Sequence, residues 1–351
     1  MADKAVLVTG ASGFIASHVV QQLLESGQRV HGTVRSTKNE GKINHLLDMQ
    51  TRWPGQLTLF EADLLVPGSF DAAMQGCSVV YHLASPFFIE NKIRDGQKDV
   101  VEPALSGTKH VLDAVGKCDT VELVVLTSSV VAIFGDNADV LQMKNATLST
   151  EYFNTTSTVS HNAYSYSKVL AEKEAWRYHD AQPAPPRWKL VTINPGMVLG
   201  PSLSPTSESG SLSLMHQLLR GELFLGVPDL WFSIADVREV ATAHLQAASN
   251  PDAHGRYIIA HKQTYGFVEL ARILRSLTKS SRIPKNTLPH LVVSLSGPFI
   301  GLSRKWLSLN QGIKFNLDNG PSLSELGTVY RPLEETLADH LESWKAQQSS
   351  R

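Results

Sequence analysis

The chain has 351 residues, of which 42% are hydrophobic and 19% are charged. Its 32 Lys and Arg residues nearly balance its 33 Asp and Glu residues, so no overall field attracts nucleic acid or an anionic membrane, and we expect a small-molecule partner. A chain of this length suits one large α/β domain with a smaller second lobe.

The two cysteines, Cys77 and Cys118, show no CxxC spacing. We therefore expect reduced core thiols, with neither a disulfide framework nor a zinc site. The 13 histidines are scattered without metal-ligand spacing, so we expect no metal.

The apolar run at residues 5–9 follows MADK directly, without the pattern of a signal peptide, and we expect a cytoplasmic protein. The longest late apolar stretch, residues 288–302, is interrupted by His, Ser, Gly and Pro. It is too short to span a bilayer, so no transmembrane segment is expected. Two interpretations of this stretch stay open: it covers a pocket, or it touches a membrane surface.

Short apolar runs of β-strand composition alternate with stretches whose apolar residues recur at helical spacing. The runs predict strands at residues 5–9, 29–34, 57–60, 79–83, 122–128 and 189–194. Because parallel strands need crossovers, and the crossovers here are helical, the pattern predicts an α/β fold with a doubly wound parallel sheet of the Rossmann type.

The pattern changes beyond residue 200. Residues 201–213 contain six serines and two prolines, which indicates a mobile loop suited to cover a ligand. Residues 233–248 predict a helix, and residues 255–260 predict a strand that returns to the sheet.

The segment LVTGASGFIASH, residues 7–18, places Gly10 just after the first strand and Gly13 at the opening of a helix. The tight turn needs a residue without Cβ at Gly10, and a diphosphate needs close backbone approach at Gly13. Ala16, one turn later, is small enough for the helix to pack on the strand. This turn predicts a dinucleotide cofactor.

The tip of the second strand indicates which dinucleotide binds. NAD sites usually have an acid there for the adenosine ribose, whereas an arginine accommodates the 2′-phosphate of NADP. The strand ends in Arg35, Lys42 follows, and no acid stands at the tip. Because a guanidinium binds phosphate through bidentate, charge-assisted hydrogen bonds, the sequence favours NADP(H). The alternative is that Arg35 is a solvated loop residue.

The segment NAYSYSK, residues 162–168, contains two tyrosines and one lysine. Residues four apart share one face of a helix, so Tyr164 pairs with Lys168 and Tyr166 does not. A free phenol loses its proton only near pH 10, so a proton donor at neutral pH needs its anion stabilised, and an ammonium one turn away does this. An amphipathic helix with a surface lysine is the structural alternative.

The fifth predicted strand ends in LTSS, which places Ser128 and Ser129 at the carboxyl edge of the sheet. Open α/β sheets bind ligands at this edge. A serine hydroxyl there can donate a hydrogen bond to a carbonyl oxygen that gains negative charge as hydride arrives, which is typically worth about 100-fold in rate.

The glycine turn, LTSS and YxxxK, in this order, resemble the extended short-chain dehydrogenase/reductase superfamily. Four longer segments look like the branch of dihydroflavonol reductases, cinnamoyl-CoA reductases and microbial aldehyde or ketone reductases: TGASGFIASHVVQQLLESG, TVRSTKNEGKINHLLD, ADLLVPGSFDAAMQGCSVVYHLASP and INPGMVLGP. The similarity covers residues 4–262 well and the later lobe loosely.

The resemblance implies that Ser129 orients a substrate carbonyl, that Tyr164 gives the proton, and that Lys168 binds the nicotinamide ribose. Asp63 and Leu64 would flank the adenine. The complete set of residues expected to contact the cofactor is Gly10, Ser12, Gly13, Phe14, Ile15, Arg35, Lys42, Asp63, Leu64, Leu83, Ala84, Ser85, Tyr164, Lys168, Pro195, Gly196, Val198 and Ser211. We expect an NADP-binding domain at residues 1–199 plus about 228–262, and a smaller, interleaved substrate-binding lobe at residues 200–227 plus 263–351.

The expected activity is NADPH-dependent reduction of a ketone or aldehyde by a monomer or homodimer. Plant cinnamoyl-CoA reductases carry Asn-Trp-Tyr-Cys-Tyr where this chain has NAYSY, which disfavours a CoA thioester. The segment VVAIFGDN, residues 130–137, lacks the polar residue with which plant flavonoid reductases contact their substrate, which disfavours a flavonoid. The distal segment, residues 297–337, resembles microbial members with an apolar insertion and suggests an apolar, aromatic, lipid-like or sterol-like substrate.

Two rival functions remain open. A sugar-nucleotide epimerase/dehydratase with tightly bound NAD shares Ser, Tyr and Lys, and its diphosphate would need cations of the distal lobe, for which the candidates are Arg282, Lys285, Arg304 and Lys305. Arg35 argues against it. A non-catalytic dinucleotide sensor would keep the glycine turn and lose Tyr or Lys, and this chain has both.

Overall fold

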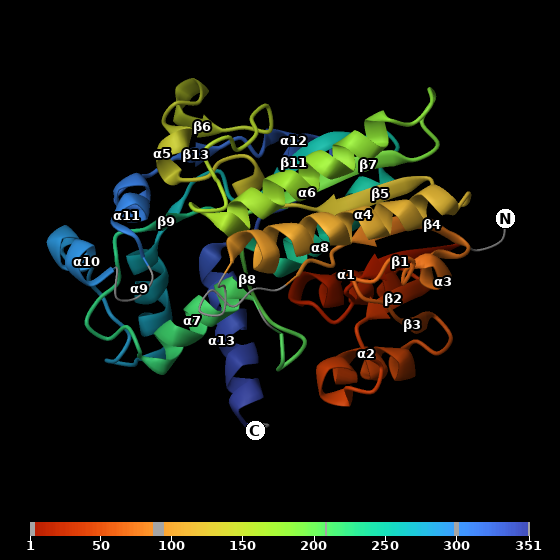
Figure 1. Ribbon diagram of the computed structural model, residues 1–351. Helices are drawn as coiled ribbons and strands as arrows, with labels where there is room; N and C mark the ends of the chain where they lie inside the picture. Colours follow the sequence, from red (N-terminus) through yellow and green to blue (C-terminus); the bar gives the residue numbers. More distant parts are fainter. Residues whose placement is uncertain (1–3, 87–94, 208, 298–301, 350–351) are drawn as a thin grey trace.

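The computed structural model describes residues 4–86, 95–207, 209–297 and 302–349. Its centre is a seven-stranded sheet in the order β11-β7-β5-β4-β1-β2-β3, in which every neighbouring pair is parallel (Figure 1). The strands are β1 (Ala5–Thr9), β2 (Val30–Val34), β3 (Leu57–Glu61), β4 (Cys77–His82), β5 (Leu123–Thr127), β7 (Lys189–Pro195) and β11 (Gly255–Ile259). This doubly wound parallel sheet confirms the predicted fold class.

Helices cover both faces of the sheet. One face packs against α1 (Phe14–Glu25), α2 (Glu40–Arg52) and α8 (Val237–Ser249). The other packs against α3 (Asp71–Met74), α4 (Glu102–Lys117, preceded by the π-helical turn Gln97–Val101) and α6 (Ala163–Asp180). Figure 1 shows α4 and α6 side by side over the sheet.

Strand β1 shows why the sheet needs two cores. All five of its residues are buried, and successive side chains point to opposite faces. Val6 and Val8 join the cluster under α1 and α8, whereas Ala5 and Leu7 join the cluster under α3 and α4. A strand that is covered on both faces, as β1 is, therefore requires a continuous apolar run.

The distal part of the chain builds a third core. It joins α7 (Gly210–Arg220), α9 (Phe267–Thr278) and the first turns of α13 (Leu333–Ser349) through buried leucines. The shorter helices are α5 (Asn137–Val140), α10 (His290–Ser296), α11 (Arg304–Asn310) and α12 (Gly320–Ser324), with 3-10 turns at Val130–Ala132 and Lys144–Ala146.

Three small two-stranded sheets complete the structure. They are the parallel pair β8 (Met197–Leu199) with β10 (Ile234–Asp236), the antiparallel pair β9 (Trp231–Phe232) with β12 (Tyr265–Gly266), and the parallel pair β6 (Thr147–Leu148) with β13 (Asn316–Leu317). The proposed division of the chain into two interleaved domains stays a prediction.

The six predicted strands are confirmed, with ends that move by one or two residues, and so is the strand predicted at residues 255–260. Two other predictions are wrong in part. The helix predicted at residues 233–248 starts only at Val237, because Ile234–Asp236 pairs with β8 and the Asp236 carboxylate caps the helix by accepting the Arg238 N–H at 2.8 Å. The loop predicted at residues 201–213 ends at Ser209, because Leu212 is buried and draws the following residues into α7.

Both cysteines are free and buried, as predicted, and burial raises the pKa of Cys77 to about 12. In the described ranges of the chain, no helix combines the length and the apolar character that crossing a membrane requires. The apolar stretch at residues 288–302 forms α10, and its residues 298–301 lie outside the described residues.

Candidate active site

The segments that follow the parallel strands meet at the carboxyl edge of the sheet, where open α/β sheets bind ligands. Most predicted site residues lie in the segments after β1, β2, β3, β4, β5 and β7, or on α1, α2, α6 and α7, whereas Pro195 ends β7 and Val198 lies in β8. The topology therefore brings residues far apart in sequence to one edge.

The turn after β1 has the shape that a diphosphate requires. Gly10 has φ of +66°, and a Cβ there would lie 3.0 Å from the Cα of Ala84. Gly13 precedes α1, and no side chain of the described residues caps the N–H groups of the first helical turn. Unpaired N–H groups at a helix start attract anions. The ring of Phe14 is buried, so that residue offers its backbone only.

A buried hydroxyl fixes the segment after β4. Thr9 Oγ1 accepts hydrogen bonds from the N–H groups of Leu83 (3.1 Å) and Ala84 (2.9 Å) and lies 2.9 Å from Nδ1 of His82. Because the hydroxyl already accepts twice, it donates its proton to Nδ1. Burial, followed by the charge of Lys168, lowers the pKa of His82 to about 3. His82 is therefore neutral and holds this segment in place.

Tyr164 and Lys168 lie one turn apart on α6. Nζ of Lys168 is 5.7 Å from the centre of the Tyr164 ring and donates a hydrogen bond of 3.1 Å to Oγ of Ser85. Tyr164 is 47% exposed, so its phenol is open to a ligand. Tyr166, two residues further, is half-buried and points to another side of the helix. Lys168 thus connects the tyrosine helix to the predicted cofactor segment.

The two serines after β5 have different surroundings. Ser128 is buried and its hydroxyl donates to the Glu172 carboxylate. Ser129 is half-buried, and its hydroxyl oxygen accepts the N–H of Val131 at 3.3 Å. Within the described part of the chain, no acceptor takes the Ser129 hydroxyl proton. Ser129 is therefore the serine that can donate to a ligand.

A buried network under these serines was not predicted from the sequence. Glu172 is 1% exposed and accepts hydrogen bonds from Ser128, from Nδ2 of Asn194 at 2.9 Å and from Nε of Arg256 at 2.5 Å. Asn194 also donates to the carbonyl of Ser129 at 3.1 Å. The network joins β5, α6, β7 and β11. The sequence indicates this network only through the position of Glu172 one turn after Lys168. The cation that Glu172 binds, Arg256, comes from the distant strand β11.

A second buried carboxylate holds the start of α6. Asp136 accepts hydrogen bonds from Asn162 (2.9 Å), His161 (2.6 Å) and Asn310 (2.6 Å). Asn162 precedes α6 with φ of +61°, a left-handed conformation that asparagine tolerates. Asn310 belongs to α11, so Asp136 joins the tyrosine helix to the distal part of the chain.

The predicted 2′-phosphate residues follow β2, the strand that pairs with β1. Arg35 follows β2 and is exposed, and Lys42 lies half-buried in the first turn of α2. The loop between them is held by Thr37, whose N–H and hydroxyl both donate to Glu61 at 2.7 and 2.8 Å. The hydrogen bond from the Thr37 N–H, and then the one from its hydroxyl, are the main causes that lower the pKa of Glu61. The structure places Arg35 directly after the carboxyl end of β2 and Lys42 at the start of α2.

The remaining predicted contacts are partly engaged within the protein. The carboxylate of Asp63 accepts the N–H of Leu65 at 2.9 Å, and Leu64 packs against Gly107. Ser211 donates to the carbonyl of Val198 at 2.7 Å, which positions the start of α7. Pro195 is buried in β7.

Gly196, which directly follows β7, was predicted to contact the cofactor. The structure leaves no room for a side chain at this residue. A Cβ there would lie 2.6 Å from the Ser233 carbonyl oxygen. Its N–H donates to the carbonyl of Ile259 at 3.1 Å. A glycine is therefore required where β7 passes into β8.

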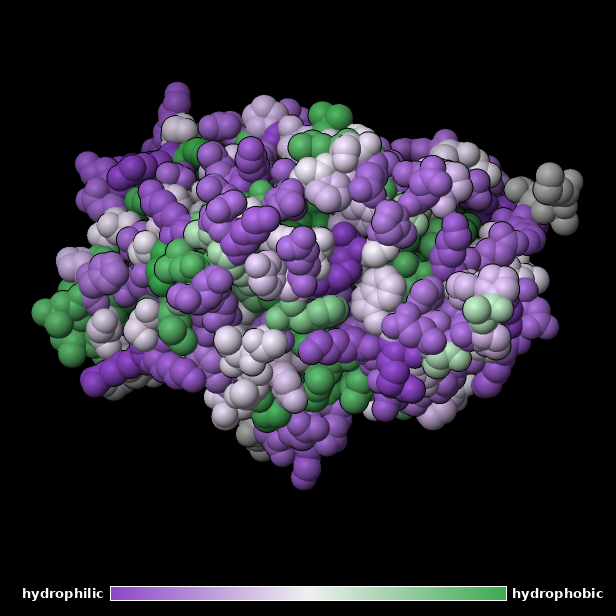
Figure 2. Space-filling model, turned by 90° about the horizontal axis from the view of Figure 1, so that it is seen from above, coloured by the Kyte–Doolittle hydropathy of each residue, from purple (hydrophilic) through white to green (hydrophobic). Residues whose placement is uncertain are grey.

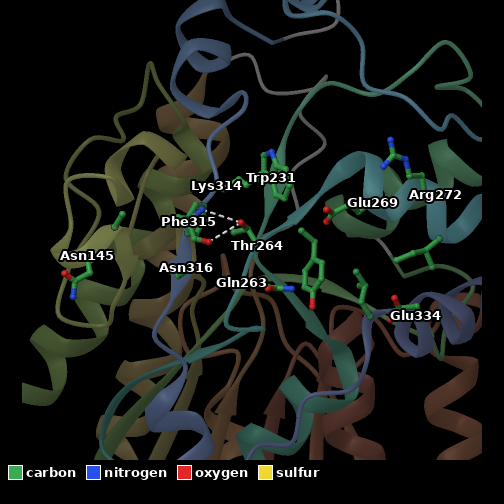
Figure 3. A pocket seen from close by; sticks show the side chains of 14 residues that line it. Asn145, Trp231, Gln263, Thr264, Glu269, Arg272, Lys314, Phe315, Asn316 and Glu334 are labelled. Carbon is green, nitrogen blue, oxygen red and sulfur yellow. Dashed lines mark hydrogen bonds between the residues drawn. The ribbon is translucent and has the colours of Figure 1, made fainter.

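One hollow lies apart from the predicted catalytic side chains. A cavity of about 720 Å³ is lined by Trp231, Tyr265 and Phe315 together with charged side chains that include Glu269 and Glu334. Figure 3 shows Glu269, Arg272 and Glu334 on one side and Phe315 and Asn145 on the other. Neither Ser129, Tyr164 nor Lys168 lines it. A smaller hollow lined by His82, Ser85, Ser128 and Lys168 lies at the sheet edge, and we place the site there on the chemistry of its residues.

Comparison with known proteins places these features in a family. Residues 6–260 match the model of the NAD dependent epimerase/dehydratase family. Over 344 residues the chain is 32% identical to "Cinnamoyl-CoA reductase CAD2" of Medicago truncatula, covering 97% of this chain and 96% of the relative. It is 36% identical to a "Putative anthocyanidin reductase" of Ginkgo biloba over 296 residues, covering 81% and 82%.

A solved structure is similar to this chain over nearly the whole length of both. The NADPH complex of Gre2 from Candida albicans superposes with a TM-score of 0.80 at 30% identity, covering 98% of this chain and 99% of that chain. The match therefore extends through the distal part of the chain, beyond the region of the family model.

Proposed function

The chain belongs to the NAD-dependent epimerase/dehydratase family, and we propose that within it the protein is an NADP-dependent reductase that converts a ketone or aldehyde carbonyl to the alcohol. The proposal rests chiefly on the position of the Lys168 ammonium. It lies one helical turn from the exposed Tyr164 ring and donates a hydrogen bond to Ser85. The reductase names of its relatives and the NADPH complex of a similar structure support it.

The residues at the sheet edge fit NADP(H). The Gly10 turn leaves no room for a Cβ, and the uncapped start of α1 offers N–H groups to a diphosphate. Arg35 and Lys42 offer positive charge near the end of β2 for a 2′-phosphate. When bound, the nicotinamide supplies the hydride.

The chain's own side chains handle the proton and the developing charge. Tyr164 donates its phenolic proton to the carbonyl oxygen, and the Lys168 ammonium stabilises the phenolate that remains. The Ser129 hydroxyl donates a hydrogen bond to the same oxygen as it gains negative charge. His82 and Thr9 hold the Ser85 segment against which Lys168 is fixed.

We further propose an apolar substrate. The segment after Ser129 reads VVAIF, and the segment that starts at Pro195, the last residue of β7, reads PGMVL, so neither brings a charge to the site. Val131 and Met197 are partly buried at the margins of two apolar clusters, and part of their surface remains available. An aromatic or lipid-like ketone or aldehyde suits such surroundings better than a sugar nucleotide.

A substrate panel tests the proposal. The purified chain is incubated with NADPH and with aromatic, long-chain, branched and short polar carbonyl compounds, and NADPH absorbance is followed. We expect turnover that rises with the apolar area of the substrate and depends on Tyr164. Background rates with every compound would contradict the reductase, and turnover of UDP-sugars without added cofactor would point to an epimerase.

A further inference from the structure

The distal part of the chain contains a long segment without acidic residues. Between Glu269 and Asp318 the sequence has no Asp or Glu, although the whole chain has 33 acids against 32 Lys and Arg. The cations of this segment are Arg272, Arg275, Lys279, Arg282, Lys285, Arg304, Lys305 and Lys314. The near-zero net charge of the chain therefore hides a basic segment, residues 270–317, and an acidic remainder.

Helix α10 in the middle of this segment turns its apolar side chains outward. Val293 is 3% exposed, whereas Leu291 is 71%, Val292 46% and Leu295 58% exposed. A surface helix normally buries its apolar stripe and exposes polar side chains. Leu291 and Leu295 are four residues apart, so they share a face of the helix and form a continuous apolar strip.

The loop after α7 extends this strip. Phe224 is 62% and Leu225 is 77% exposed. The loop lies against the segment before α10, because the N–H of Leu288 donates to the carbonyl of Val227 at 2.8 Å and a Cβ on Gly226 would lie 2.9 Å from the Leu288 side chain. We call the five residues Phe224, Leu225, Leu291, Val292 and Leu295 the apolar tip.

The apolar tip lies at one end of the molecule. In Figure 1, α10 projects at the left end, and Figure 2, turned about the horizontal axis, shows hydrophobic side chains gathered at that same end with hydrophilic ones beside them. Patches of exposed large apolar side chains usually mark an interaction surface.

Exposed cations border the apolar tip. Arg282 lies against Gly221, which comes shortly before Phe224 in the chain. A Cβ on Gly221 would lie 2.8 Å from the Cβ of Arg282. Arg304 and Lys305 are on α11, which packs on the end of α10 where a Cβ on Gly297 would meet Leu307 at 2.7 Å. Lys279 and Lys285 flank Arg282 in the chain, and all five cations are exposed. Within the described residues none of them forms an ion pair.

We propose that the apolar tip inserts into the surface of an anionic lipid bilayer while the surrounding cations contact its headgroups. Interfacial binding combines buried apolar area with attraction between Lys or Arg and anionic lipid, and this end of the molecule supplies both. The absence of a membrane-crossing helix among the described residues is compatible with binding to one leaflet.

Two other occupants fit less well. A nucleic acid would match the cations and leave Leu291, Leu295 and Leu225 facing charged phosphates. A second copy of the chain, docked through the same face, would bring the five cations opposite one another, and like charges facing each other across an interface disfavour association.

Vesicle co-sedimentation tests the proposal. The full chain is spun with vesicles of pure phosphatidylcholine or of phosphatidylcholine and phosphatidylserine in equal parts. We expect binding to the anionic vesicles that falls steeply with added salt, and little binding to the neutral ones. The double change Leu291→Asp with Leu295→Asp, and the triple change Lys279→Glu, Arg282→Glu and Lys285→Glu, should each weaken binding by about tenfold or more.

A matched control keeps the result specific. Leu323 on α12 is 47% exposed and Val329, five residues after that helix, is 80% exposed. Helix α12 lies away from α10 in Figure 1. Leu323→Asp with Val329→Asp should retain full vesicle binding. Far-ultraviolet circular dichroism and thermal melting confirm that each variant is folded, and the reduction rate with a water-soluble carbonyl should match the wild type in all of them.

Three results would overturn the proposal. They are no sedimentation with anionic vesicles at low salt, undiminished sedimentation of the folded Leu291→Asp, Leu295→Asp variant, and preferential binding of RNA that displaces the vesicles. A dimer in sedimentation velocity that the same variant dissociates, without vesicle binding, would assign the apolar tip to self-association instead.

Discussion

Lys168 on α6 donates a hydrogen bond of 3.1 Å to Ser85, a residue 83 positions earlier in the chain. The bond ties the helix that carries Tyr164 to the segment after β4, which approaches the glycine turn at Gly10. The helix of the predicted proton donor and the segment of the predicted cofactor site are thus directly connected, and the first prediction concerns that donor.

Tyr164→Phe should lower kcat by at least about 100-fold, because the carbonyl oxygen then lacks its proton donor, a group that contributes roughly 100- to 10,000-fold. NADPH affinity, measured by fluorescence titration, should change little. Tyr166→Phe is the matched control on the same helix and should stay within a few-fold of the wild type. A Tyr164→Phe enzyme with full activity would contradict the assignment of this tyrosine.

Arg35→Asp should shift the coenzyme preference toward NADH, since it removes a phosphate partner and adds an acid able to bind ribose hydroxyls. The ratio of kcat/KM with NADPH to that with NADH measures the shift, and we expect it to fall by about tenfold or more. Arg52→Asp makes the same charge change at the far end of α2, where the guanidinium stacks on Trp53. An equal shift in both variants would mean that net charge alone sets the preference.

Glu172→Gln should destabilise the fold by about 3–5 kcal/mol, because the Arg256 guanidinium loses its buried counter-ion while staying buried. The free energy of unfolding from denaturant titration measures this loss. The double variant Glu172→Met with Arg256→Met should recover a large part of it, because no lone charge remains. If Glu172→Gln costs less than about 1 kcal/mol, the pair is not a structural anchor.

His244 should make the fold acid-sensitive. Burial lowers its pKa from 6.5 to about 4, so below pH 6.5 the unfolded chain binds a proton that the folded chain does not. Stability therefore falls as pH drops from 6.5 toward 4, by about 1.4 kcal/mol per pH unit for this residue, and His82 and His340 act in the same direction.

The change His244→Gln isolates this effect. Denaturant titrations between pH 6 and pH 4.5 should show a slope smaller by about 1.4 kcal/mol per pH unit than in the wild type, whatever the absolute stability. The exposed residue His254 provides the control, since His254→Gln should leave the slope unchanged. A His244→Gln variant with the wild-type slope would show that this histidine titrates equally in both states.

The sequence predicted the sheet and its edge because both are encoded locally. Strand β1 is a continuous apolar run, and the position of Gly10 directly after it needs no tertiary information to be interpreted. Helical spacing alone distinguished Tyr164 from Tyr166. Residue spacing alone did not distinguish Ser128 from Ser129, and the choice of Ser129 came from the family resemblance, because the acceptor that engages Ser128 is Glu172, 44 residues away.

Other features depended on contacts that spacing does not encode. Residues 233–248 have helical periodicity throughout, yet Ile234–Asp236 forms a strand because β8 offers a partner. The partners of Asp136 come from α6 and α11, so its role at the start of the tyrosine helix could not be inferred from any single segment. The basic segment is visible in the sequence, but only the structure shows that its helix α10 turns Leu291 and Leu295 outward.

The Glu172–Arg256 pair also constrains the order in which the protein matures during synthesis. The arginine enters the chain 84 residues after the carboxylate it neutralises, on the outermost strand of the sheet. A nascent chain that ends before β11 carries the Glu172 carboxylate in the middle of α6 without its counter-ion. The buried carboxylate network under the serines therefore becomes complete only after translation has passed this strand.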